Sequence, residues 1–190
     1  MTSPPDSTTA ALENARATGT CGLLTAGITS TPFGRAVLAI TDHGLCQFAF
    51  CGTRTDTDAW KELEAQWRGW SITRDDAAAS AWARRVLAGE AALPLDVRGT
   101  PFQQRVWQAL RAIPMGTTTS YGALAVAIGH PRACRAIGTA VGRNPIAVAI
   151  PCHRVLPVAG GIGNYRWGSG IKRLLLAREG IPIAGFAPSP

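Results

Sequence analysis

The stretch Ile150-Pro151-Cys152-His153-Arg154-Val155 places a thiol beside an imidazole inside an apolar part of the chain. The run from Ala147 to Ile150 just before it predicts buried backbone. Pro151 has no N–H to donate and interrupts a strand at this point, so Cys152 lies where a buried segment breaks. Neighbouring side chains in a regular strand point to opposite faces. His153 can therefore reach the Cys152 sulfur only through a kink in the backbone or a bridging water.

Two interpretations of this dipeptide are open. In the functional interpretation, Cys152 is a nucleophile that His153 activates. In the structural one, Cys152 is buried and unreactive beside a hydrogen-bonded histidine. The dipeptide alone favours the structural interpretation, because free cysteine is among the most buried residue types. The segments on either side of the dipeptide reverse that preference.

Those segments resemble the O6-alkylguanine-DNA alkyltransferases, the single-turnover DNA repair methyltransferases. The resemblance extends over about residues 97–181 in the family's order and spacing, whereas the first half of the chain matches only loosely. Several separate motifs agree, which makes the resemblance highly specific. In chain order they are Gly99-Thr100-Pro101-Phe102-Gln103-Gln104-Arg105-Val106-Trp107, Thr119-Ser120-Tyr121-Gly122, Arg135-Ala136-Ile137-Gly138, Gly142-Arg143-Asn144-Pro145, Pro151-Cys152-His153-Arg154-Val155, Gly163-Asn164-Tyr165-Arg166-Trp167-Gly168 and Leu174-Leu175-Leu176-Ala177-Arg178-Glu179-Gly180.

The resemblance implies a methylated-DNA–[protein]-cysteine S-methyltransferase that repairs DNA directly. Cys152 would take the alkyl group from O6-alkylguanine, and less readily from O4-alkylthymine, after the nucleotide is flipped out of the duplex. The transfer would be irreversible, with one turnover per molecule and no cofactor. His153 would accept the thiol proton through a water, and Glu179 would orient the imidazole.

The same resemblance gives roles to further positions. Asn144 would be the hinge between the DNA-binding helix and the active-site turn, and the Tyr121 phenol would hydrogen-bond the guanine ring nitrogen. Arg135 would fill the space that the flipped base leaves in double-stranded DNA, and Arg132 would contact phosphate. In the substrate pocket, the Val155 carbonyl would read the exocyclic amine and the Arg166 amide would address O6. Tyr165 and Trp167 would shape the pocket.

Residues 121–141 predict a helix-turn-helix. Ser120 caps the first helix, Gly129-His130 forms the turn, and Pro131 begins the second helix. Gly138 lies inside that second helix, where glycine costs about 1 kcal/mol relative to alanine. Close packing against a neighbouring helix would explain it. Entry into a minor groove only about 6 Å wide would explain it equally well, and the family places this helix there.

The whole chain predicts an α+β fold. A small N-terminal domain of sheet plus helices, residues 21–97, precedes a mainly helical C-terminal domain, residues 98–190, that holds the helix-turn-helix and the active site. Residues 1–20, rich in Ser, Thr, Pro and Ala, predict a mobile tail.

Within the N-terminal domain, Gly34–Ile40 and Leu45–Phe50 predict a hairpin, and Leu93–Val97 predicts a last edge strand. Apolar spacing predicts helices over residues 58–70 and 77–87. In the C-terminal domain, Thr100 and Pro101 begin a helix that ends before Pro114. A final helix is predicted over residues 171–178, with Ile171, Leu174 and Leu175 turned inward. Glu179 opposes the helix dipole at its end and therefore needs a cationic or imidazole partner.

Composition sets wider limits. The 190 residues are 46% hydrophobic and carry a net charge of +7, which suits a globular protein with a polyanionic partner, although solubility alone also explains such a charge. The five cysteines are odd in number and form no C-x-x-C pair, which argues against a disulfide framework and a closed zinc site. We therefore expect no bound metal and a reducing cytoplasm. No signal peptide is evident and no apolar run approaches the roughly 18 residues of a membrane span, so we expect no membrane partner. We also expect a monomer.

Two rival functions use the same residues. A cysteine hydrolase would use Cys152, His153 and Glu179 over many turnovers and would need an oxyanion hole. A DNA-damage sensor would bind alkylguanine without repairing it. Sensors that resemble this chain lack the cysteine, so the presence of Cys152 argues against the second rival.

Overall fold

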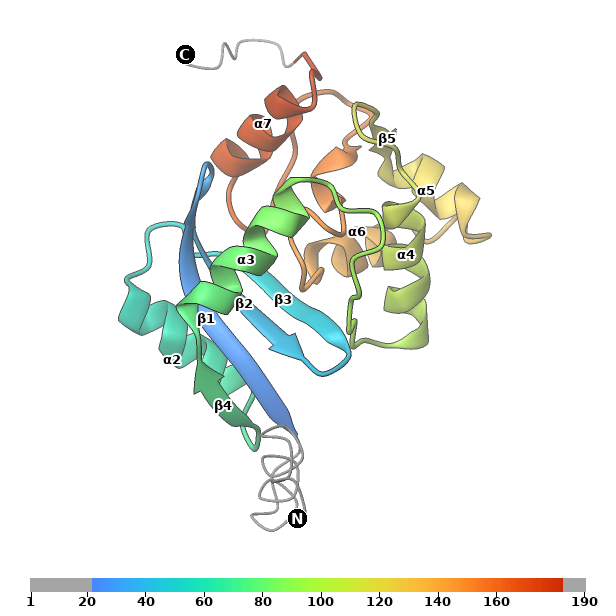
Figure 1. Ribbon diagram of the computed structural model, residues 1–190. Helices are drawn as coiled ribbons and strands as arrows, with labels where there is room; N and C mark the ends of the chain where they lie inside the picture. Colours follow the sequence, from blue (N-terminus) through green and yellow to red (C-terminus); the bar gives the residue numbers. More distant parts are fainter. Residues whose placement is uncertain (1–21, 183–190) are drawn as a thin grey trace, which may run out of the picture.

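A four-stranded sheet forms most of the N-terminal half (Figure 1). The computed structural model describes residues 22–182, so the predicted tail over residues 1–20 and Cys21 lie outside the described residues. The strands are β1 (Leu23–Thr31), β2 (Gly34–Thr41), β3 (Gly44–Phe50) and β4 (Ser71–Arg74), in the order β3-β2-β1-β4. Neighbours among the first three are antiparallel, and β4 is parallel to β1. The predicted hairpin is thus confirmed as β2 and β3.

The sequence did not indicate β1 or β4. The β1 segment contains Gly27 in its middle, which weakens a strand pattern. A Cβ at Gly27 would lie 2.5 Å from the Asp75 carbonyl oxygen, so only glycine lets the chain pass this closely. The reason for this glycine is a contact between segments 48 residues apart, which no local pattern reveals.

Two helices cover the sheet. Helix α2 (Asp56–Gln66) begins at the Thr55 cap and ends earlier than predicted, and its Ala59 and Leu63 pack against one face. Helix α3 (Asp76–Leu87) packs on β1 and β2 from the other face (Figure 1). The predicted edge strand at Leu93–Val97 is wrong. The segment lies beside β3, but only Leu95 pairs with it, in an isolated bridge with Leu45.

The C-terminal half is mainly helical, as predicted. Helix α4 (Pro101–Arg111) has the expected Thr100 cap, completed by Gln103 as a capping box. Helices α5 (Tyr121–Ala127) and α6 (Cys134–Gly142) form the helix-turn-helix. The Trp107 indole donates to the Ala140 carbonyl oxygen at 2.8 Å and so fastens α6 to α4. Helix α7 (Ser169–Arg178) closes the fold, and strands β5 (Thr119–Ser120) and β6 (Val155–Leu156) pair in parallel near the site.

The start of the second helix was predicted wrongly. Helix α6 begins at Cys134 and not at Pro131, and it has no side-chain cap. Arg132 therefore lies in the preceding turn, while Arg135 occupies the first helical turn. The two arginines do not share one helical face.

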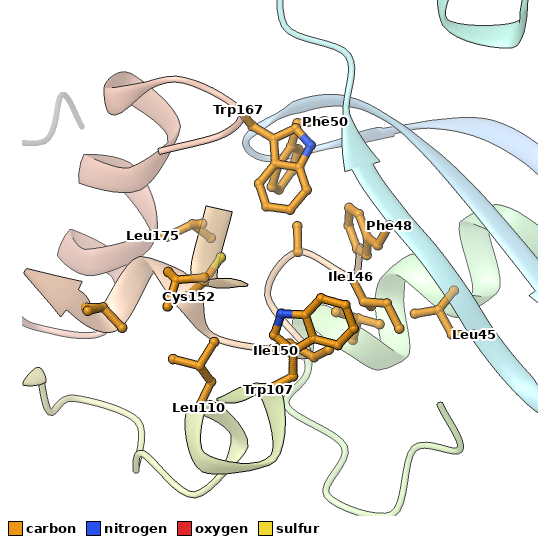
Figure 2. Packing of buried hydrophobic residues seen from close by; sticks show 14 of the residues in the cluster. Leu45, Phe48, Phe50, Trp107, Leu110, Ile146, Ile150, Cys152, Trp167 and Leu175 are labelled. Carbon is orange, nitrogen blue, oxygen red and sulfur yellow. The ribbon is translucent and has the colours of Figure 1, made fainter. Parts of the chain in front are cut away.

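One large core joins the two halves of the chain. Figure 2 shows sheet residue Phe48 beside Ile146 and sheet residue Phe50 beside Trp167, both partners coming from the C-terminal half. A smaller core lies between the other face of the sheet and α2. The N-terminal sheet therefore contributes to the packing beneath Cys152. Among the described residues, no helix is long and apolar enough to cross a membrane.

Candidate active site

The turn before Cys152 is held on the edge of the sheet. The Ala147 amide donates to the Phe48 carbonyl oxygen at 2.8 Å, and the Phe48 amide donates to that of Pro145 at 3.1 Å. Within the turn, Val148 has φ +67°, a left-handed conformation that a β-branched residue rarely adopts. Such backbone persists only where its surroundings fix it, and β3 supplies that support.

Asn144 connects this turn to the sulfur. Its Nδ2 donates to the Ile150 carbonyl oxygen at 2.8 Å and lies 3.0 Å from Cys152 Sγ, while its Oδ1 accepts from the Ile146 amide at 2.9 Å. The side chain is fully buried. Asn144, predicted as a hinge residue, thus fixes the position of the thiol through three contacts.

Cys152 is a buried thiol at rest. It begins the short 3-10 turn η1 (Cys152–Arg154), is 4% exposed and lies among core residues that include Leu175 and Ile150 (Figure 2). Burial raises the pKa of Cys152 to about 11, although the Asn144 hydrogen bond and the Lys172 charge act in the opposite direction. At neutral pH the proton therefore stays on sulfur until a base removes it.

His153, the next residue in the chain, is the candidate base. Its Nε2 lies 2.7 Å from Glu179 Oε1, and Nδ1 is buried without a hydrogen-bond partner among the described residues. Burial lowers the pKa of His153, and the Glu179 carboxylate opposes that effect only in part. A neutral imidazole that donates from Nε2 to Glu179 leaves a lone pair on Nδ1. Cys152 and His153 lie in a 3-10 turn and not in a regular strand, so the backbone does not hold their side chains on opposite faces.

Glu179 caps the end of α7 and has both kinds of partner that its position predicted. Besides His153, Arg154 donates from Nε to Oε2 at 2.8 Å and from Nη2 to Oε1 at 2.9 Å. The Gly116 amide adds a bond to Oε2 at 3.2 Å. Burial alone would raise the pKa of Glu179, but these hydrogen bonds outweigh it and lower the pKa to about 2.

Sequence reasoning missed two charged residues of this site. Lys172, in α7, is fully buried and donates to the Val155 carbonyl oxygen at 2.7 Å. Burial lowers the pKa of Lys172 to about 8. Arg154 was visible in the motif beside His153, but nothing local indicated that it binds Glu179, 25 residues away.

Leu174, predicted to face inward, is instead 38% exposed.

Two tyrosines approach the sulfur from different elements. The Tyr165 hydroxyl is buried without a partner among residues 22–182, and burial together with the neighbouring Cys152 raises the pKa of Tyr165 well above its usual value. Tyr121, at the start of α5, has its pKa raised by burial and by Cys152. Both phenols therefore keep their protons at neutral pH and can donate hydrogen bonds.

Tyr121 also lines a surface hollow of about 620 Å³ beside α6. Arg135 and Gly138, two of the residues predicted to meet DNA, line the same hollow, and Arg132, a third, is exposed in the turn before α6. We call this the α6 hollow. Its other lining residues include Thr139, Pro157, Gly163 and Asn164.

The side chains of Trp167 and Arg166, two of the predicted pocket residues, lie next to β3 and α2. The Trp167 ring packs edge-on against Phe50, with centroids 6.2 Å apart, and against Tyr165 at 5.2 Å. Arg166 donates from Nη1 to the Asn144 carbonyl oxygen at 3.2 Å. Both side chains line a different hollow, of about 300 Å³, next to β3 and α2. Trp167 and Arg166 therefore contribute to the site through their contacts with Phe50 and Asn144.

No group of three or more His, Cys, Asp or Glu residues within residues 22–182 is arranged to hold a metal ion. The described cysteines are Cys46, Cys51, Cys134 and Cys152, all free thiols, and Cys134 is the exposed one.

Comparisons with known proteins show the family. Residues 101–181 match the family model described as "6-O-methylguanine DNA methyltransferase, DNA binding domain". The methylated-DNA–protein-cysteine methyltransferase of Methanosarcina acetivorans is 38% identical over 159 residues, which cover 80% of this chain and 96% of that protein. The bifunctional transcriptional activator/DNA repair enzyme Ada of Escherichia coli is 41% identical over 152 residues, 77% of this chain and 42% of Ada.

The mycobacterial relatives match over a shorter region. The Mycobacterium tuberculosis methylated-DNA–protein-cysteine methyltransferase is 55% identical over 85 residues, 52% of its length. This chain thus spans about half the length of several of the curated relatives it matches. The crystal structure of the M. tuberculosis O6-methylguanine methyltransferase in complex with DNA has a TM-score of 0.66 and 36% identity, and covers 82% of this chain and 92% of that one.

Proposed function

Because the chain belongs to the O6-methylguanine-DNA methyltransferase family, we propose that it repairs alkylated DNA by moving the alkyl group of O6-alkylguanine onto its own Cys152. One observation carries the proposal: Asn144, just after the helix-turn-helix, contacts the buried Cys152 sulfur, and the adjacent His153 is hydrogen-bonded to Glu179. The family's DNA-binding region and the relatives' names give the substrate class.

The transfer is a single displacement at carbon. The Cys152 proton passes to His153 Nδ1 through a water, and the sulfur attacks the alkyl carbon. A sulfur–carbon bond forms while the bond from carbon to O6 breaks, and the electron pair stays on guanine. Tyr121, which keeps its proton at neutral pH, supplies a hydrogen bond to the departing guanine anion. The thioether is stable, so each molecule acts once.

The DNA partner follows from the α6 hollow. A base inside a duplex cannot bring its O6 substituent to a sulfur that is 4% exposed, so the nucleotide must be flipped. Arg135 at the rim of the hollow is placed to occupy the gap in the stack, and its planar guanidinium suits that task. The net charge of +7 favours association with the phosphate backbone.

The proposal has finer parts that follow the family. Double-stranded DNA with O6-alkylguanine is the partner, O4-alkylthymine is a poorer substrate, and the chain acts as a monomer in the cytoplasm without a cofactor. Free thiols at Cys46, Cys51, Cys134 and Cys152 suit a reducing compartment.

Intact-protein mass after incubation with DNA that carries O6-methylguanine tests the proposal. We expect one methyl group per molecule, localised to Cys152 by peptide mapping, together with stoichiometric loss of O6-methylguanine. Lesion binding without a mass change would support a damage sensor instead, and catalytic turnover with unmodified protein would support a hydrolase.

Gly138→Ala is expected to stabilise the protein by about 0.5–1 kcal/mol and to weaken DNA binding. Glycine inside a helix is unfavourable, and a Cβ at Gly138 would lie no closer than 3.9 Å to Tyr121, so packing within the chain does not require glycine. A narrow minor groove against α6 would require it. Thermal unfolding and DNA titration measure the two effects. Gly170→Ala in α7 is the control: a Cβ there meets nothing within 4 Å, and DNA affinity should stay unchanged.

Arg135→Ala is expected to slow methyl transfer from duplex DNA by about tenfold or more, while reaction with free O6-benzylguanine changes little. The free base needs no flipping, so only duplex substrate depends on a residue that fills the stack. Single-turnover rates on both substrates measure the ratio. Equal losses on both would assign Arg135 to the fold or the pocket.

Arg132 provides the comparison for Arg135. As a phosphate contact in the turn before α6, it should affect affinity alone. Arg132→Ala is expected to weaken binding to all sequences uniformly and to reduce the slope of log K against log salt by about 1.

A further inference from the structure

All three guanidinium nitrogens of Arg154 donate hydrogen bonds within the site. Its Nε and Nη2 donate to the two oxygens of Glu179 at 2.8 and 2.9 Å, and Nη1 donates to the Ile113 carbonyl oxygen at 2.5 Å. Its side chain is 11% exposed and that of Glu179 is 8% exposed. Such a two-point ion pair between a guanidinium and a carboxylate, largely shielded from water, has a fixed geometry.

The Glu179 carboxylate binds His153, Arg154 and the Gly116 amide at the same time. Oε1 accepts from both His153 and Arg154, and Oε2 accepts from Arg154 and the Gly116 amide. An unshared buried carboxylate 2.7 Å from an imidazole would draw a proton onto that ring. A carboxylate already neutralised by arginine orients the ring without doing so.

Two cations and one carboxylate face His153. Lys172 from α7 and Arg154 from η1 are cations that disfavour the imidazolium, and Glu179 at the end of α7 favours it. Cys152 and Tyr165 are protonated at rest and bring no charge. Burial has the largest effect on both pKa values and favours a proton on sulfur, and the Arg154 charge adds to this by offsetting Glu179.

We propose that Arg154, by sharing both oxygens of Glu179, helps burial to keep the Cys152–His153 pair uncharged in the absence of DNA. Arg154 is thus a positioning residue that acts through the carboxylate. The inference rests on the proposed function, because a protein that uses its thiol once is lost whenever another electrophile reacts with it. A neutral pair leaves the thiol protonated until an alkylated base is bound.

Arg154→Gln in the full chain, without DNA, tests this directly. The chain has three histidines, so NMR titration of imidazole-labelled protein resolves His153, with His43 and His130 as internal references. We expect the His153 pKa to rise by about one unit, the lower end of what one close charge does. Reaction of Cys152 with iodoacetamide at neutral pH, followed by peptide mass, should accelerate by about tenfold. If the glutamine variant does not fold, Arg154→Met keeps the apolar stem and serves the same purpose.

Three further variants separate charge from loosened packing. Arg154→Lys retains the charge and should restore most of the wild-type titration and reactivity. Arg178→Gln removes a cation from the residue next to Glu179, where Arg178 instead donates to the Leu87 carbonyl oxygen, and should change neither. In the double variant Arg154→Gln/Glu179→Gln the carboxylate is gone, so the His153 pKa and the thiol reactivity should fall back. A double variant at least as reactive as Arg154→Gln would mean that the site had merely opened, and the inference would be wrong.

Neither readout uses DNA, so the two proposals fail separately. An unchanged His153 titration in Arg154→Gln overturns the role of Arg154 even if methyl transfer occurs. A shifted titration in a protein that transfers no methyl group would support the role of Arg154 and refute the proposed function.

Discussion

Cys152→Ala is expected to abolish methyl transfer completely and to leave DNA affinity within about twofold of wild type. The sulfur is the acceptor of the alkyl group, and no other group in the site can replace it. Cys152 is 4% exposed in the core, away from any surface that meets phosphate. Asn144 keeps its bond to the Ile150 carbonyl oxygen in the variant, so the turn should retain its shape. Intact mass and a DNA titration measure both quantities.

Cys134→Ala is the matched control for this substitution. Cys134 is the exposed thiol at the start of α6 and should accept no methyl group from O6-methylguanine. Its loss should leave the transfer stoichiometry at one. Methyl transfer by Cys152→Ala, or its loss in Cys134→Ala, would move the acceptor away from Cys152.

Glu179→Gln is expected to slow methyl transfer by at least about a hundredfold, the usual contribution of a positioned base and its partner, with a much smaller effect on DNA affinity. Glutamine has the size of glutamate but cannot stabilise the imidazolium that forms when His153 takes the thiol proton. It also leaves the Arg154 guanidinium without its anion, and an unpaired buried charge costs stability. Single-turnover rates at neutral pH and thermal unfolding check both effects.

Glu90→Gln is the control for a nearby carboxylate. Glu90 lines the same surface cleft as Glu179 but pairs with Arg85 at 2.6 Å in an exposed ion pair. Such pairs contribute little, so transfer should proceed at the wild-type rate. A wild-type rate in Glu179→Gln itself would remove Glu179 from the proton path.

The sequence predicted those elements whose signals are local. The Thr100 cap with Pro101 predicts α4, and the apolar runs on both sides of residues 41–44 predict β2 and β3. The motif identified Cys152, whose Sγ lies 3.0 Å from Asn144 Nδ2 in the structure. The dipole argument identified Glu179, whose Oε1 lies 2.7 Å from His153 Nε2. In each case the deciding interaction joins residues near in sequence, or the resemblance supplied the pairing.

Tertiary structure alone decided the rest. Gly27 is required by the approach of Asp75, and the segment around Leu95 pairs with β3 over a single residue. The burial of Lys172, and the two-point contact of Arg154 with Glu179, join residues 17 and 25 positions from their partners. A charged residue in a sequence reads as exposed, because burying a charge is costly unless a partner is present. Whether that partner is present depends on how distant segments pack, so the electrostatic state of the thiol was determined by the fold and not by the motif that contains it.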